Sequence, residues 1–170
     1  IEHLEGKRKI EDVSSLIYLD LKGNIKQTQK KDPVCLSELS MSDLTGFPIE
    51  KYFLPEIIMP VQLSRGCYWK KCTFCDHDFG QTYNVKNLDT LINELKNFQI
   101  KYGINNFEFT DDCISPAFLK SFSEKIIENG LKINWYCDLR LENALTQEIL
   151  DLAYKAGLKM VLWGFEAGSK

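Results

Sequence analysis

Residues 106–129 read NFEFTDDCISPAFLKSFSEKIIEN and contain one strand-and-helix unit. Two phenylalanines alternate with polar residues over 106–110, which is the pattern of a half-buried strand. Pro116 suits the first turn of a helix, and Ser115 before it can cap the free backbone N–H groups. The sequence therefore predicts a strand over 106–110, a polar turn, and a helix over 116–129.

The same order is repeated on both sides of this unit. Apolar residues recur at three- and four-residue steps over 88–102 and 146–156, which predicts two more helices, the first with Asn87 or Asp89 near its cap. Short apolar runs predict strands over 57–63, 133–137 and 160–164. Strands that alternate with helices form right-handed βαβ units, so we expect an α/β fold with about four parallel strands.

The beginning of the chain shows no such repeat. Two short apolar runs, over 16–20 and 25–28, flank a turn and predict a small β-hairpin. Residues 35–49 lack a sustained period and are predicted to be loop. We therefore expect a connector with one hairpin over residues 1–55 and an α/β domain over residues 56–170.

Composition limits the classes of protein that the chain can represent. The 170 residues are 44% hydrophobic, enough for one domain with a real core, and the formal net charge of -3 implies no general affinity for nucleic acid. No run of 18 apolar residues and no signal peptide is present, so we expect a cytoplasmic chain without a membrane segment. Because the chain starts at Ile1 and stops at Lys170 after a strand-like run, we expect it to be part of a longer protein.

Three of the six cysteines lie close together, directly after the first predicted strand of the α/β domain. Cys67, Cys72 and Cys75 have the spacing C-x4-C-x2-C, and thiolates are soft ligands that suit iron–sulfur clusters or zinc. A cubane cluster on three thiolates leaves one iron without a protein ligand, so another molecule can bind there. The remaining cysteines are expected to be small buried or half-buried side chains: Cys35, Cys113 and Cys137.

Polar residues also follow each of the later strands, where parallel α/β folds place their sites. Asp111 and Asp112 are acceptors suited to an ammonium group, and Arg140 can clamp a carboxylate with its planar fork. Glu166 can accept hydrogen bonds from sugar hydroxyls. An amine, a carboxylate and a ribose are parts of S-adenosylmethionine, so the sequence predicts a site for this molecule beside the cysteines.

The segments Arg65-Gly66-Cys67 and Cys72-Thr73-Phe74-Cys75, with the strand and helix order behind them, resemble the radical S-adenosylmethionine superfamily. The chain is similar, over roughly residues 16–170, to the branch that often carries an N-terminal cobalamin-binding domain. The resemblance implies that 56–170 is the N-terminal part of a TIM-like (βα) barrel, with its last strands outside the chain. The spacing departs from the commonest family pattern, C-x3-C-x2-C, by one residue between Cys67 and Cys72.

The resemblance also implies an activity and a set of ligands. By this resemblance, a [4Fe–4S] cluster on Cys67, Cys72 and Cys75 is expected to cleave S-adenosylmethionine reductively to methionine and a 5′-deoxyadenosyl radical, which abstracts hydrogen from a small-molecule or peptide substrate. Phe74 lies along the adenine, Asp111 and Asp112 bind the methionine amine, Glu166 meets the ribose, and Arg140 is a further contact. The implied partners are an electron donor such as flavodoxin or ferredoxin and, through a domain outside this chain, cobalamin.

Several alternatives remain open from the sequence. The three cysteines and His77 can instead be zinc ligands, which would make the chain a zinc-stabilised α/β binding module without catalysis. Asp111 and Asp112 can simply begin the turn before a helix, Arg140 can form a surface ion pair, and Glu166 can be structural. Within the enzyme interpretation, the sequence does not distinguish methylation, modification of a peptide or natural product, and ring chemistry.

Overall fold

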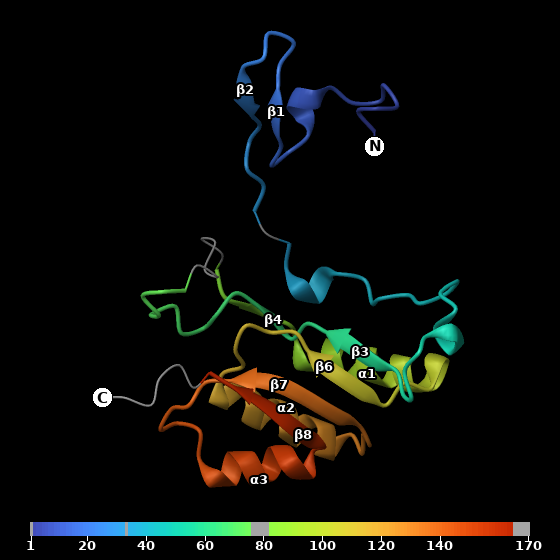
Figure 1. The fold of residues 1–170 in the computed structure, drawn as a ribbon, viewed down its shortest axis with the longest axis vertical. Coiled ribbons are helices and arrows are strands. Elements are labelled where there is room, and N and C mark those ends of the chain that lie inside the picture. Colours follow the sequence, from blue (N-terminus) through green and yellow to red (C-terminus); the bar gives the residue numbers. More distant parts are fainter. Residues whose placement is uncertain (1, 33, 76–81, 165–170) are drawn as a thin grey trace. The chain divides into compact units, whose positions relative to one another are not determined.

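The protein is described by a computed structural model that covers residues 2–32, 34–75 and 82–164 (Figure 1). The chain separates into two compact units, Ile1–Val34 and Cys35–Lys170. The second unit begins before the boundary expected at residues 55 and 56. Residues after 35 belong with the α/β part because the Leu44 N–H donates to the Tyr102 hydroxyl at 2.9 Å and the Asn87 N–H donates to Ser37 Oγ at 2.8 Å.

The first unit contains the predicted β-hairpin. Strands β1 (Ile17–Leu19) and β2 (Ile25–Gln27) pair in antiparallel register, after a short 3-10 turn at Ile10–Asp12. Asp20 organises the connecting turn, because its carboxylate accepts hydrogen bonds from the N–H groups of Lys22 and Asn24 at 2.9 Å each. The hairpin prediction is therefore confirmed.

The second unit is built on a four-stranded parallel sheet with strand order β3-β6-β7-β8 (Figure 1). The strands are β3 (Ile58–Val61), β6 (Asn106–Phe109), β7 (Asn134–Leu139) and β8 (Leu158–Trp163). The helices are α1 (Leu88–Tyr102), α2 (Pro116–Glu128) and α3 (Gln147–Lys155). The alternation of strands and helices and the parallel pairing agree with the prediction.

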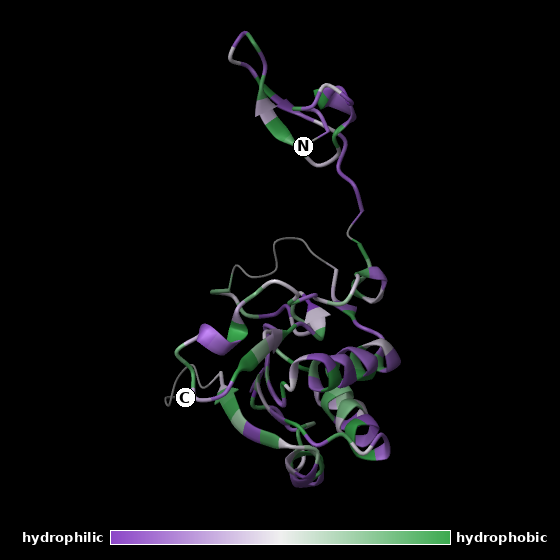
Figure 2. Cartoon of the chain, turned by 90° about the vertical axis from the view of Figure 1, so that its right-hand side faces the viewer, coloured by the Kyte–Doolittle hydropathy of each residue, from purple (hydrophilic) through white to green (hydrophobic). Residues whose placement is uncertain are grey.

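All three helices pack on one face of this sheet. Phe107, Phe109 and Trp135 are buried on that face against apolar residues of α1 and α2, such as Phe98 and Phe122. Figure 2 shows that the helices carry both hydrophobic and hydrophilic residues, as expected for amphipathic helices with one face on a core. Alternate residues of the two central strands point to the other face, where they are polar and partly exposed: Asn106, Glu108, Tyr136 and Asp138. The edge strands add exposed apolar side chains to the same face, namely Ile58, Met160 and Leu162.

The described strands form an open sheet, with β3 and β8 at its two edges. A closed barrel therefore remains an expectation from the family resemblance. Strand β7 runs two residues further than predicted, through Asp138 and Leu139, because a polar side chain is tolerated on the exposed face. A short antiparallel pair, β4 (Ser64–Arg65) with β5 (Asn84–Val85), was not predicted, because two-residue strands have no readable period. No helix among the described residues is long and apolar enough to cross a membrane.

The start of α1 supports a first prediction. The Asn87 side chain accepts hydrogen bonds from the N–H groups of Asp89 at 2.9 Å and Thr90 at 3.2 Å, so Asn87 is the N-cap. Replacing Asn87 with alanine is expected to lower the free energy of unfolding by about 1 kcal/mol, because two N–H groups of the first turn lose their acceptor. Urea denaturation measures the loss. Asn87→Ser should retain most of the stability, and equal losses in the two variants would contradict the capping role.

Candidate functional site

A hollow of about 500 Å³ lies at the carboxyl ends of the central strands. Four segments that are distant in the sequence form its wall: the cysteine loop, the turn after β6, the end of β7 and the end of β8. Its lining residues include three of the predicted site residues from the strand ends and the loop, namely Phe74, Asp112 and Arg140, together with Cys67, Cys72 and Cys75. The structure thus places these residues together at one end of the sheet, as the sequence argument expected, and their roles there stay predictions.

The three cysteines of the loop border this hollow as free thiols. Cys67 is half-buried, and Cys72 and Cys75 are exposed. Within the described ranges 2–32, 34–75 and 82–164, no three His, Cys, Asp or Glu side chains are arranged to hold a metal ion. The donor set nevertheless fits an iron–sulfur cluster in kind, since three soft ligands border one space, and metal centres commonly draw their ligands together on binding.

Asp111 is buried and holds the beginning of the cysteine loop. Only 3% of the residue is exposed. Its carboxylate accepts hydrogen bonds from the Leu63 N–H at 3.0 Å, from the Ser64 hydroxyl at 2.5 Å and from the Ser64 N–H. Burial raises the pKa of Asp111 above its ordinary value, and the donors at Leu63 and Ser64 oppose this rise without cancelling it. The carboxylate thus ties the end of β6 to the chain that leads into Cys67.

Asp112, the next residue, has the opposite placement. Asp112 is exposed and borders the hollow. The two neighbouring aspartates, which the sequence treats as equivalent, therefore differ in burial: Asp111 is buried against the start of the cysteine loop, and Asp112 is exposed at the hollow. Contact of either residue with a methionine amine remains a prediction, and the geometry favours Asp112 for it.

Arg140 borders the hollow and also contacts two protein groups. Its guanidinium carbon lies 3.5 Å from the centroid of the Trp69 ring, which is a close cation–π contact. Its Nη1 lies 3.3 Å from Glu142 Oε2. Sequence reasoning missed Glu142 and Trp69 as functional partners. The only local signal was that Glu142 follows Arg140 by two residues.

Two further groups in the wall were not assigned a role from the sequence. Cys113 is only 7% exposed, and burial raises the pKa of its thiol to about 11. Burial also raises the pKa of Asp138, with smaller contributions from the charges of Glu108 and Asp112. In both groups burial therefore favours the protonated form relative to the same group in water.

Of the remaining predicted site residues, the structure describes Phe74 but not His77 or Glu166. The Phe74 ring borders the hollow and is 70% exposed, so a planar ligand could cover it. Glu166 and His77 lie outside the described residues, so the ribose contact and the zinc alternative through His77 stay predictions.

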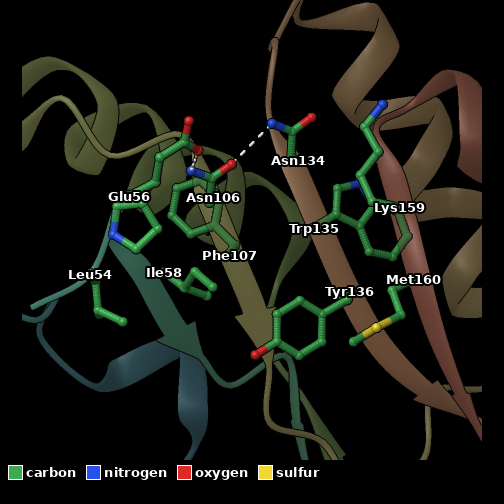
Figure 3. Close-up of a pocket in the computed structure, with 11 residues that line it drawn as sticks. Leu54, Glu56, Ile58, Asn106, Phe107, Asn134, Trp135, Tyr136, Lys159 and Met160 are labelled. Carbon is green, nitrogen blue, oxygen red and sulfur yellow. Dashed lines mark hydrogen bonds between the residues drawn. The ribbon is translucent and has the colours of Figure 1, made fainter.

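A second hollow, of about 730 Å³, lies at the opposite ends of the same strands (Figure 3). Ile58, Tyr136 and Met160 give it a largely apolar wall. The Asn106 amide donates to the Glu56 carboxylate at 2.6 Å and accepts from the Asn134 amide at 2.9 Å, so these polar groups bond to one another. Of the two hollows, the one at the carboxyl ends carries the cysteines and is the better candidate site.

Comparison with known proteins supports a relationship to methyltransferases. No protein-family model matches the chain. Over 99% of its length it is 24% identical to an uncharacterised methyltransferase of Pyrococcus horikoshii, and equally to the cytidylyl-2-hydroxyethylphosphonate methyltransferase of Streptomyces wedmorensis. The chain spans 38% of the length of each of these relatives.

Among solved structures, the chain is similar to the cobalamin-dependent S-adenosylmethionine radical enzyme OxsB. The form with aqua-cobalamin and S-adenosylmethionine bound aligns with a TM-score of 0.76 at 20% identity, covering 99% of this chain and 26% of OxsB. The apo form aligns with a TM-score of 0.70. The chain therefore shares its fold with a part of OxsB.

Proposed function

We propose that the chain is part of a radical S-adenosylmethionine enzyme that transfers a methyl group. The observation that carries this proposal is the hollow at the carboxyl ends of the strands, where Cys67, Cys72 and Cys75 meet Asp112 and Arg140. Support comes from the relatives, which are methyltransferases, and from the fold shared with part of OxsB. A [4Fe–4S] cluster on the three thiolates would supply the electron that cleaves S-adenosylmethionine.

The chain's own residues would bind and orient S-adenosylmethionine in this site. Asp112 offers a carboxylate for the amine, and the exposed Phe74 ring offers a flat apolar surface for the adenine. Arg140 is positioned over Trp69, so its guanidinium keeps a defined place at the edge of the hollow. Asp111 holds the base of the cysteine loop and acts on the ligand only through that loop.

Other parts of the proposal lie outside the described site. Cobalamin is included because OxsB is cobalamin-dependent, and no residue of this chain is assigned to it. The electron would come from a reduced flavodoxin or ferredoxin type of donor, and the substrate would be a small molecule or a peptide. The substrate named for the Streptomyces relative is not transferred to this chain.

Metal analysis after anaerobic reconstitution tests the proposal. The chain is incubated anaerobically with ferrous iron and sulfide and, in a separate sample, with zinc, because thiolates bind Zn²⁺ more tightly than Fe²⁺ when the two compete directly. Each sample is desalted and analysed for iron, sulfide and zinc. We expect a brown protein with about four irons, whose visible absorption is bleached by dithionite. We also expect S-adenosylmethionine to change the electron paramagnetic resonance spectrum of the reduced cluster. A colourless chain with one zinc and no iron would instead establish the zinc-stabilised module.

A further inference from the structure

The four residues between Cys67 and Cys72 make specific contacts in the structure. The Tyr68 hydroxyl donates a hydrogen bond to Glu142 Oε1. The Trp69 ring lies 3.5 Å from the Arg140 guanidinium carbon and 4.7 Å from Lys71 Nζ, measured from the ring centroid. A spacer that only lengthened the loop would not need these contacts.

Glu142 and Arg140 complete a closed set of contacts on the other side. One carboxylate oxygen of Glu142 accepts from Tyr68, and the other lies 3.3 Å from Arg140 Nη1. Arg140 in turn covers Trp69. The Glu142 side chain is only 17% exposed, so its charge-assisted hydrogen bonds are shielded from water and from salt.

The Tyr68 side chain also lies close enough to a buried thiol to interact with it. The thiol of Cys113 interacts with Tyr68 and is buried, and the Tyr83 ring meets the Tyr68 ring edge-on at 6.2 Å between centroids. Burial, and next the hydrogen bond to Glu142, raises the pKa of Tyr68 well above its ordinary value.

The backbone after Trp69 turns in a way that a side-chain-bearing residue rarely adopts. Lys70 has a φ of 52°, in the left-handed region, which redirects the backbone directly after Trp69. Such a conformation costs free energy, of the order of 1 kcal/mol, and persists only where neighbouring contacts hold it. The contacts of Tyr68 and Trp69 on one side of Lys70 are suited to that role.

We propose that the four-residue spacer is a docking segment, and that Glu142 is the positioning residue that holds the cysteine loop against the β7–α3 connection. The additional residue relative to C-x3-C-x2-C then supplies the length needed to seat both Tyr68 and Trp69 between Cys67 and Cys72. The purpose of this docking rests on the proposed function, because positioning matters only if the three thiolates share one centre. The docking itself is a property of the metal-free chain.

Thiol labelling of the metal-free chain tests the docking. Cys113 is buried and interacts with Tyr68, so its reactivity reports opening of the loop, whereas Cys137 is buried in the core and reports opening of the fold. A background with Cys72→Ser and Cys75→Ser prevents the exposed thiols from reacting. After a short pulse of N-ethylmaleimide, mass spectrometry measures the labelling rate at each cysteine.

Glu142→Gln and Tyr68→Phe are each expected to accelerate labelling of Cys113 about tenfold, since each removes a charge-assisted hydrogen bond, and to leave Cys137 unchanged. The matched controls Glu128→Gln and Tyr154→Phe, at exposed positions on α2 and α3, should change neither rate. The proposal is overturned if Cys113 reacts no faster in the test variants than in the controls. It is also overturned if Cys113 and Cys137 accelerate together, because that pattern means general unfolding.

A double variant and a cluster spectrum give two further measurements. Tyr68→Phe combined with Glu142→Gln should accelerate labelling of Cys113 no more than the more effective single variant does, since both variants break the contact between Tyr68 and Glu142. In reconstituted protein with all cysteines present, Glu142→Gln should alter the electron paramagnetic resonance spectrum of the reduced cluster, while Glu128→Gln should not. If no cluster forms in any variant, the proposed function fails while the labelling result still decides the docking.

Discussion

Replacing Cys72 with serine is expected to remove the visible colour and nearly all of the iron from reconstituted protein. Serine keeps the size of the side chain but substitutes a hard oxygen for the soft sulfur that binds iron. Cys72 is exposed at the hollow, so the substitution should leave the free energy of unfolding of the metal-free chain within about 0.5 kcal/mol of the original. Cys67→Ser and Cys75→Ser are expected to behave in the same way.

The matched control for this series is Cys35→Ser. Cys35 is a half-buried free thiol that does not line the hollow, so its variant should keep the iron and the colour. Iron content, sulfide content and visible absorption are measured on all four variants prepared side by side. Iron retained in any of the three loop variants at the level of Cys35→Ser would remove that cysteine from the proposed ligand set.

The Asp111→Ala variant is expected to lose about 3 kcal/mol of unfolding free energy, because the buried N–H groups of Leu63 and Ser64 would be left without an acceptor. The Ser64 hydroxyl loses the same partner. Asp111 also joins the end of β6 to the start of the cysteine loop, so we expect poorer iron incorporation as well. Urea denaturation of the metal-free chain measures the first effect, and iron content after reconstitution measures the second.

Asp112→Ala serves as the control for the neighbouring carboxylate. Asp112 is exposed, so its replacement should change the free energy of unfolding by less than about 0.5 kcal/mol. If the proposed function holds, Asp112→Ala should instead weaken the change that S-adenosylmethionine causes in the electron paramagnetic resonance spectrum of the reduced cluster. If the two variants lose the same stability, the structural role of Asp111 is wrong. If only Asp111→Ala loses the response to S-adenosylmethionine at unchanged stability, the inner carboxylate is the ligand contact.

The elements of the fold were largely predictable from local patterns. The helix over 88–102 was predicted with the bounds that the structure has, since apolar residues at helical spacing, a cap and a terminating glycine lie within one short segment. Asn87, Ser115 and Thr146 cap their helices through side-chain oxygens. The parallel sheet followed from the alternation of strands and helices, because a chain can return in the same direction only through a crossover.

Part of the candidate site was predictable for the same reason. The carboxyl ends of parallel strands meet at one edge, so residues that follow the strands were expected to gather there, and Asp112, Arg140 and the three cysteines do. The position of each residue directly after a strand was enough for this prediction, because it already places the residue at the carboxyl edge of the sheet.

Contacts between distant segments depended on packing and had no local pattern. The aspartates at 111 and 112 differ by one position, yet the pleat and the turn send one into donors at Leu63 and Ser64 and leave the other exposed. Tyr68 and Glu142 meet across 74 residues of sequence. The sequence by itself thus determined the helices and strands and the edge of the sheet at which the site lies. It could do so because the burial of helix and strand residues leaves a short repeat of apolar residues in the sequence. The three-dimensional packing decided which side chains hold the cysteine loop, because those contacts exist only once β6 and β7 lie side by side.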